Sequence, residues 1–124
     1  MMVDLRKDDC LVRLDPQTGG AIAAFTWRGI PVLRPVSDWR LWAQHGRAVA
    51  GYPLIPYANR ISEGRFSVAA ESFQLSPNFG DEKGSIHGNA WMRPWRVAEA
   101  GNDHARLTLS HRPPDDPASA QSAG

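Results

Sequence analysis

Short runs in which apolar and polar residues alternate recur along the chain, and this period of two is typical of β-strands. Residues 10–14 (CLVRL) alternate in this way, and residues 15–20 (DPQTGG) supply a proline, an aspartate and two glycines for a turn. Residues 21–27 (AIAAFTW) then predict a strand that returns beside the first. The economical interpretation is a β-hairpin near the start of the chain.

Two more hairpins are predicted further along the chain. Residues 66–75 (FSVAAESFQL) predict two strands joined by a tight turn near Glu71. Another alternating run begins at Trp95, turns at residues 101–103 (GND) and continues to Ser110. Nowhere do apolar residues repeat at helical spacing for more than about two turns, so an all-β, antiparallel architecture is favoured.

The segments between these hairpins are less regular. Residues 30–33 (IPVL) predict a short strand that ends before Pro35. Residues 39–45 (WRLWAQH) fit either one helical turn or an irregular crossing, and the sequence does not decide between them. Residues 77–85 (PNFGDEKGS) are rich in turn formers and charge, which predicts a surface loop.

Two stretches combine a stiff backbone with polar side chains. Residues 51–65 (GYPLIPYANRISEGR) contain two prolines and cannot lie inside a regular helix or a central strand, so they present Asn59 and Arg60 from an irregular segment. Residues 85–95 (SIHGNAWMRPW) gather a histidine, two tryptophans and an arginine. These residue types predict a polar pocket with flat apolar walls.

The order of these motifs resembles the first part of the aldose 1-epimerase (galactose mutarotase) family. The resemblance is carried by PLIPYANRISEGRFS at residues 53–67, NFGDEKGSIHG at residues 78–88 and WMRPW at residues 91–95. A weaker match, LDPQTGGAIAAFTWRGIPVLRP at residues 14–35, is similar to the opening strands of the family. No single motif is specific, but their order is.

The resemblance implies an antiparallel β-sandwich of the galactose mutarotase type. Residues 1–112 are expected to be the N-terminal portion of such a domain. Residues 113–124 are rich in proline and small residues and are expected to be a disordered tail, because they bury too little to offset their ordering entropy. Chains of the family continue with further strands, so this chain is expected to be truncated partway through the fold.

The chemistry implied by the resemblance is interconversion of the α and β anomers of a free aldose. A base removes the proton of the anomeric hydroxyl while an acid protonates the ring oxygen, and the opened ring closes on its other face. No cofactor or metal is needed. In the family the acid is a histidine and the base a glutamate from later parts of the chain, so no catalytic residue is assigned here. The arginine and histidine that line the sugar site match Arg60 and His87.

Each candidate binding residue also has a purely structural interpretation. Arg60 offers a fork of donors suited to sugar oxygens, but an arginine after a turn is commonly solvated or salt-bridged. His87 lies beside a glycine, where the backbone can approach a ligand, but it could equally be a turn histidine bonded to the backbone. Asn59 either binds the sugar or caps its own turn. Trp91 either stacks on a sugar ring or packs in the core, whereas Trp95 is expected in the core.

Composition excludes several other kinds of function. The net charge of +1 gives no general attraction to nucleic acid or anionic membranes. The lone Cys10 cannot form an internal disulfide, and the start of the chain lacks the apolar core of a signal peptide. His45, His104 and His111 lack the spacing of a metal site, and no run approaches the length of a membrane span. A soluble, cytoplasmic protein without a metal is expected.

Three functions fit these observations. The first is an aldose 1-epimerase for free hexoses such as glucose or galactose, present as an incomplete chain. The second is a non-catalytic carbohydrate-binding fragment, which the missing acid and base favour. The third is a hexose-phosphate mutarotase, suggested by residues 27–35 (WRGIPVLRP), although no arginine cluster stands out. Because an incomplete sandwich leaves strands uncovered, self-association is also expected.

Overall fold

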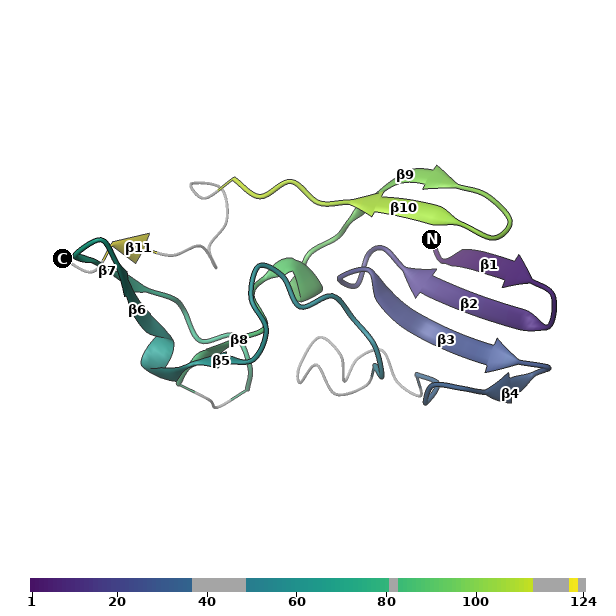
Figure 1. The fold of residues 1–124 in the computed structure, drawn as a ribbon, viewed down its shortest axis with the longest axis horizontal. Helices are drawn as coiled ribbons and strands as arrows, with labels where there is room; N and C mark the ends of the chain where they lie inside the picture. Colours follow the sequence, from purple (N-terminus) through teal and green to yellow (C-terminus); the bar gives the residue numbers. More distant parts are fainter. Residues whose placement is uncertain (37–48, 81–82, 113–120, 123–124) are drawn as a thin grey trace. The chain divides into compact units, whose positions relative to one another are not determined.

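The computed structural model describes residues 1–36, 49–80, 83–112 and 121–122, and Figure 1 shows their fold. The chain divides into two compact units, each with its own sheets. The first comprises Met1–Pro53 and Ala90–Leu109, and the second comprises Leu54–Asn89 and Ser110–Gly124.

A four-stranded antiparallel sheet in the order β1–β2–β3–β4 forms much of the first unit (Figure 1). The strands are β1 (Val3–Lys7), β2 (Cys10–Asp15), β3 (Ala21–Trp27) and β4 (Ile30–Pro31). The antiparallel pairing of β2 with β3 confirms the first predicted hairpin, and its register shifts after Arg13. β4 is shorter than the predicted strand, although the Val32 backbone N–H still donates a hydrogen bond to the Phe25 carbonyl at 2.8 Å.

The edge strand β1 was not predicted, because its short sequence VDLRK carries three charged residues. Val3 is nevertheless buried, and the register places Asp4 opposite Arg13 of β2. The Arg13 guanidinium donates to both carboxylate oxygens of Asp4, at 2.7 and 2.8 Å. These hydrogen bonds hold the pKa of Asp4 below its usual value. This cross-strand pair fits the strand pairing but, being exposed, contributes little to stability.

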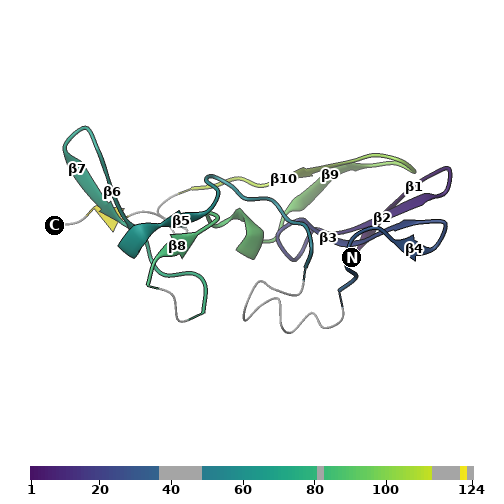
Figure 2. The same ribbon diagram turned by 60° about the horizontal axis from the view of Figure 1, so that its bottom comes forward.

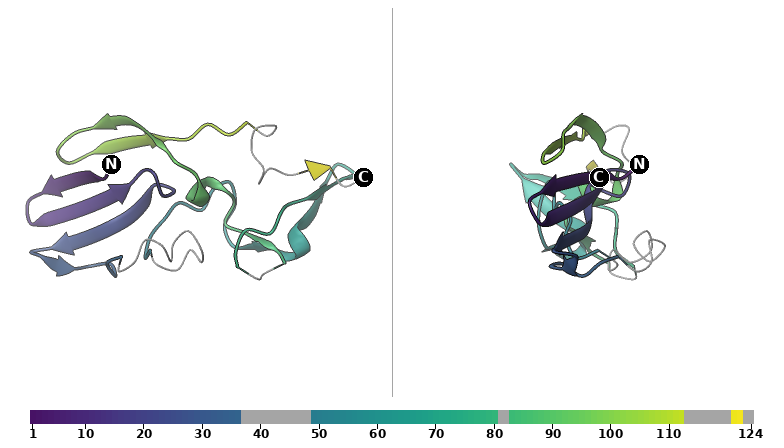
Figure 3. Two further views of the ribbon diagram at one scale, coloured as in Figure 1. Left: turned by 180° about the vertical axis from the view of Figure 1, so that it is seen from behind. Right: turned by 90° about the vertical axis from the view of Figure 1, so that its right-hand side faces the viewer.

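The last predicted hairpin also belongs to the first unit. It consists of β9 (Arg96–Ala100) and β10 (Ala105–Thr108), which pair antiparallel as expected. Figure 3 shows this hairpin beside β1, and the Arg6 backbone N–H donates to the Asn102 carbonyl in its turn at 2.6 Å. The short 3₁₀ helix η2 (Ala90–Met92) precedes the hairpin, and the Trp95 indole N–H donates to the Ala90 carbonyl at 2.9 Å.

The second unit is built from a hairpin and a short ribbon (Figure 2). The hairpin contains β6 (Arg65–Val68) and β7 (Glu71–Gln74), the ribbon contains β5 (Arg60–Ile61) and β8 (Ser85–Ile86), and the 3₁₀ helix η1 (Ser62–Gly64) joins β5 to β6. The ring centroids of Phe66 and Phe73 lie 5.2 Å apart across the hairpin. Its turn is formed by Ala69 and Ala70, both with positive φ, directly before Glu71, so the predicted hairpin with a turn near Glu71 is confirmed. Alanine carries no sequence signal for such a turn.

The fold class predicted from the sequence is confirmed: the described part of the chain is all-β, and every ladder between its named strands is antiparallel. Residues 39–45, whose conformation the sequence left open, lie outside the described residues, as do residues 113–120 and 123–124 of the expected tail. The last strand, β11 (Gln121–Ser122), pairs with β7. Among the described residues, no helix has the length and apolar character needed to cross a membrane.

Candidate functional site

The pairing of β5 with β8 brings together two motifs that are 28 residues apart in the sequence. Arg60 lies opposite Ile86 in the register. Just beyond this pair, the His87 backbone N–H donates to the Asn59 carbonyl at 3.0 Å. In return, the Asn59 backbone N–H donates to the ring nitrogen Nδ1 of His87 at 2.9 Å. Asn59, Arg60 and His87 therefore form one cluster, which we call the Asn59–Arg60–His87 cluster.

The backbone of this cluster adopts an unusual conformation. Asn59 and His87 have φ values of 68° and 59°, in the left-handed region that side chains other than those of glycine and asparagine rarely adopt. The Asn59 side-chain oxygen accepts a hydrogen bond from the Arg60 backbone N–H at 2.9 Å. The side chain of Asn59 thus has the local capping role that was one of its two predicted interpretations. Its binding role remains a prediction.

Asn78, which the sequence placed only in a surface loop, holds the backbone around His87. Its side-chain amide donates to the carbonyls of Ile86 and Gly88 at 2.8 and 2.9 Å. Its side-chain oxygen accepts from the Ile86 backbone N–H at 2.8 Å. The asparagine in the NFG motif was visible in the sequence, but no local pattern indicates bonds to residues 8 and 10 positions away.

Gly88 allows two segments of the second unit to approach each other closely. It forms a bridge with Ile55, and the backbone N–H of Asn89 donates to the Ile55 carbonyl at 3.1 Å. A Cβ atom at position 88 would lie 2.0 Å from that carbonyl oxygen, and the φ of Gly88 is +67°. Both the contact and the conformation require glycine here. The peptide bond between Ile55 and Pro56 is cis.

The electrostatic environment of His87 favours a neutral ring. Desolvation by partial burial and the positive charge of Arg60 lower the pKa of His87 below its ordinary value of 6.5. At neutral pH the imidazole is therefore uncharged, and Arg60 is the cation of the cluster. A neutral imidazole beside a guanidinium provides hydrogen-bond donors for acceptor oxygens.

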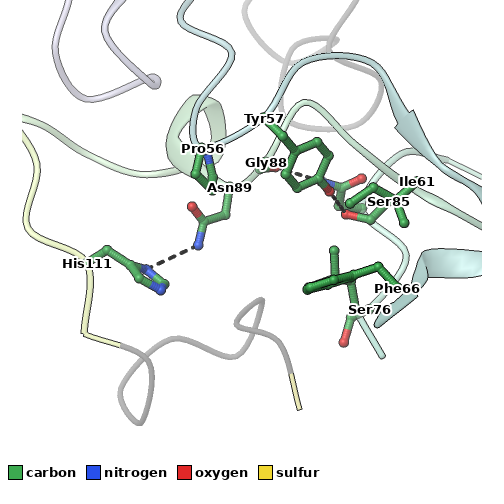
Figure 4. Close-up of a pocket in the computed structure, with 11 residues that line it drawn as sticks. Pro56, Tyr57, Ile61, Phe66, Ser76, Ser85, Gly88, Asn89 and His111 are labelled. Atoms are coloured by element: carbon green, nitrogen blue, oxygen red, sulfur yellow. Dashed lines mark hydrogen bonds between the residues drawn. The ribbon is translucent and has the colours of Figure 1, made fainter. Parts of the chain in front are cut away.

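A cavity of about 290 Å³ lies in the same unit (Figure 4). The Tyr57 hydroxyl and the Ser85 hydroxyl are hydrogen-bonded to each other on one side of it, and the Asn89 amide lies 3.4 Å from Nδ1 of His111 on another. The residues that line it are Pro56, Tyr57, Ile61, Phe66, Leu75, Ser76, Asn78, Ser85, Gly88, Asn89 and His111.

Ser85, Gly88 and Asn89, from the stretch that predicted a polar pocket, line this cavity, but none of the four predicted binding residues does. Ile61 and Ser85, one cross-strand pair of the ribbon, border the cavity, whereas the next pair, Arg60 and Ile86, does not. Successive pairs in a ribbon face opposite sides. The Arg60–Ile86 pair therefore faces away from the cavity, whereas Gly88, which follows His87, borders it.

Trp91 belongs to the first unit, whereas the other three predicted binding residues belong to the second. It is 6% exposed, and its ring centroid lies 6.1 Å from that of Tyr52. Its backbone carbonyl packs against Gly19. A Cβ atom at position 19 would lie 1.9 Å from the Trp91 carbonyl oxygen. These contacts give Trp91 a packing role in its own unit, and its predicted contact with a sugar stays a prediction.

The described residues contain no group of three histidine, cysteine, aspartate or glutamate side chains that could hold a metal ion. The cluster instead offers nitrogen donors, from a guanidinium and an imidazole, beside backbone groups that are already paired. Such an arrangement can bind hydroxyl and ether oxygens by hydrogen bonds. This arrangement defines a candidate binding site for a ligand with acceptor oxygens.

Comparison with known proteins assigns the fold to a class. The fold is of the galactose mutarotase type, because the structure superposes on solved structures of that type. The chain belongs to the aldose 1-epimerase family, whose sequence pattern matches residues 4–120. The resemblance inferred from the motifs is thereby confirmed.

Two sequence relatives come from Escherichia coli K12, and both are named as uncharacterized proteins. YphB is 31% identical over 102 residues, covering 82% of this chain and 34% of the relative. YihR is 29% identical over 90 residues, covering 73% of this chain and 28% of the relative. The chain thus spans about a third of the length of the curated relatives it matches.

Solved structures agree with this assignment. A putative aldose 1-epimerase from Escherichia coli K12 superposes with a TM-score of 0.80 and 28% identity, over 90% of this chain and 37% of that one. A galactose 1-epimerase from Lactobacillus acidophilus NCFM superposes with a TM-score of 0.63 over 86% of this chain and 32% of that one. At 22% identity, the second likeness shows the shared fold alone.

Proposed function

We propose that this chain supplies the sugar-binding part of an aldose 1-epimerase that interconverts the α and β anomers of a free aldohexose. In this proposal Arg60 and His87 donate hydrogen bonds to the sugar, with Asn59 beside them. The observation that carries the proposal is the reciprocal hydrogen bonding between Asn59 and His87, which joins the two family motifs into one cluster.

The charge of the cluster favours a free sugar over a hexose phosphate. Arg60 is the single charged side chain of the cluster, and His87 is neutral at pH 7 because its pKa is lowered. A phosphate group at pH 7 carries nearly two negative charges and is typically held by several cationic or backbone donors. A neutral aldohexose needs only directed donors to its oxygens, which one guanidinium and one imidazole supply.

Titration of the ¹⁵N-labelled chain with D-galactose and D-glucose tests the proposal. Backbone signals of residues 59–61 and 85–89 are expected to shift as sugar is added. Arg60→Ala and His87→Ala should each raise the Kd about 10-fold to 100-fold, because a hydrogen bond involving a charged or closely held donor is worth about 1.5–3 kcal/mol. Nuclear magnetic resonance (NMR) provides both the shifts and the Kd.

Arg65→Ala is the matched control, because Arg65 is an exposed arginine of the same unit whose guanidinium donates to the Gln74 side chain at 2.7 Å. Its Kd should equal that of the unaltered chain. Saturable shifts confined to other residues, or unchanged affinity in both the Arg60 and His87 variants, would place sugar binding elsewhere and overturn the proposal.

We further propose that the chain associates with itself through the exposed apolar edge of the first unit. Ile30 and Val32 are 61% and 53% exposed at the β4 edge of the four-stranded sheet. Exposed apolar side chains at a sheet edge favour association because burying them removes apolar surface from water. Sedimentation velocity should therefore show a concentration-dependent shift to species larger than a monomer.

Ile30→Lys is expected to restore the monomer, because a charge at a sheet edge opposes edge-to-edge contact. Met92→Lys is the control, since Met92 is 40% exposed but lies in the 3₁₀ helix η2 and not on a sheet edge. A single monomeric boundary at all concentrations of the unaltered chain would contradict the association, as would equal effects of the two lysine variants.

A further inference from the structure

The Asn78 side chain forms hydrogen bonds with the backbone on both sides of His87. Its three hydrogen bonds, of 2.8, 2.9 and 2.8 Å, engage the peptide groups of Ile86 and Gly88. His87 lies between these two residues. Because the Asn78 amide uses both its acceptor and its donor end, it fixes the path of the backbone that carries the imidazole.

The contact between Asn59 and His87 determines which ring nitrogen carries the proton. A backbone N–H can only donate a hydrogen bond, so Nδ1 of His87, at 2.9 Å from the Asn59 nitrogen, must accept it. Nδ1 is therefore without a proton. In a neutral imidazole the proton then resides on Nε2, which acts as a hydrogen-bond donor.

This arrangement depends on the backbone of His87. The residue has a φ of 59° and is followed by Gly88 with a φ of 67°, so two successive residues are in the left-handed region. For the histidine this conformation is unfavourable by about 1–2 kcal/mol, and it persists only when surrounding contacts hold it. Asn78 supplies such contacts on either side of His87.

We propose that Asn78 is a positioning residue of the sugar site: it holds the backbone around His87 so that Nδ1 stays on the Asn59 amide and Nε2–H serves as a donor to a sugar oxygen. This inference rests on the proposed function and deepens it. With the Arg60 guanidinium, the site then offers donors from both side chains. It therefore recognises acceptor oxygens of the sugar, such as the ring oxygen or a hydroxyl lone pair.

The proposed state of His87 also predicts how binding depends on pH. The pKa of His87 lies below 6.5, so the ring stays neutral above that pH. As the pH falls through the lowered pKa, Nδ1 gains a proton and can no longer accept from the Asn59 amide. Sugar affinity should therefore be constant above pH 6.5 and fall below it, with Arg60 the charged group that opposes the protonation.

Nitrogen NMR of the unaltered 124-residue chain tests the inference without any sugar. The ¹⁵N shifts of His87 at pH 7.5 should show a bare Nδ1 and a protonated Nε2, which resonate far apart. The same signals followed against pH should give a pKa below 6.5. A proton on Nδ1, an even mixture of the two tautomers, or a pKa at or above 6.5 would overturn the inference.

Asn78→Ala and Asn78→Asp test the role of the asparagine itself. The aspartate keeps the size and the acceptor but cannot donate to the two carbonyls. Both variants should give mixed His87 tautomers and a several-fold higher Kd for galactose. Asn102→Ala, at an exposed asparagine in the β9–β10 turn, is the control and should change none of these. A folded Asn78→Ala chain with an unchanged His87 tautomer would refute the positioning role.

The two proposals fail in different ways. If His87 has the predicted tautomer and responds to Asn78 substitution but no sugar binds, the proposed function is wrong and the positioning of His87 stands. If galactose binds and Arg60→Ala weakens it while His87 is protonated on Nδ1, the function stands and the inference about Asn78 is wrong. The measurement on the unaltered chain decides this even if the Asn78 variants do not fold.

Discussion

The purified chain is expected to accelerate the mutarotation of α-D-galactose or α-D-glucose to less than about one-hundredth of the rate given by an intact family member. Mutarotation needs a base at the anomeric hydroxyl and an acid at the ring oxygen, and each typically contributes about 10²–10⁴-fold. The family resemblance implies that both come from other parts of the fold, and the Asn59–Arg60–His87 cluster supplies donors but no carboxylate. Polarimetry of freshly dissolved sugar measures the rate directly.

The Lactobacillus acidophilus galactose 1-epimerase, at equal molar concentration, serves as the positive control. Weak sugar binding without acceleration would support the sugar-binding part of the proposal and the alternative of a non-catalytic carbohydrate-binding fragment. Robust acceleration by the chain, lost in Arg60→Ala or His87→Ala, would contradict the prediction and show that an acid and a base are present among its own residues.

Gly88→Ala should destabilise the second unit by about 2–4 kcal/mol. The left-handed backbone at +67° costs an alanine about 1 kcal/mol relative to glycine. The added Cβ, 2.0 Å from the Ile55 carbonyl oxygen, forces a backbone shift of the kind that costs about 1–3 kcal/mol more. Urea denaturation followed by NMR signals of residues 54–89 gives the change in the free energy of unfolding.

Gly80→Ala separates the two contributions. Gly80 also has a positive φ, +54°, but a Cβ atom there meets nothing within 4 Å. It should therefore cost only about 1 kcal/mol, from the backbone conformation alone. Equal losses for the two variants would show that the close approach of Gly88 to Ile55 is not a constraint in solution.

The hairpins are the part of the fold that could be read from local sequence. β2 with β3, and β9 with β10, follow from alternating residues on either side of turn formers, because both signals act within a few residues. The β6–β7 hairpin and its turn near Glu71 were also predicted, although Ala69 and Ala70 adopt positive φ without the glycine or asparagine typical of such a turn. Strand β1 was missed because its charged residues are explained only by their partners on β2.

The candidate site was likewise predicted only in part from the sequence. Asn59, Arg60 and His87 were selected as site residues from their motifs, whose order resembles that of the family. The sequence could not predict that His87 accepts a hydrogen bond from Asn59, because the two residues are 28 positions apart. Nor could it predict the hydrogen bonds of Asn78 to the backbone on either side of His87, which join residues 8 and 10 positions apart.

The sequence by itself determined the strand-forming segments, the absence of long amphipathic helices and the identity of the motif residues, because backbone preference and side-chain chemistry are local properties. The tertiary structure alone decided the hydrogen bond between Asn59 and His87, the hydrogen bonds of Asn78, the cavity beside Tyr57 and Ser85, and the burial of Trp91. Each of these depends on which distant segments the folded backbone brings within hydrogen-bonding or packing distance, and no local pattern encodes that.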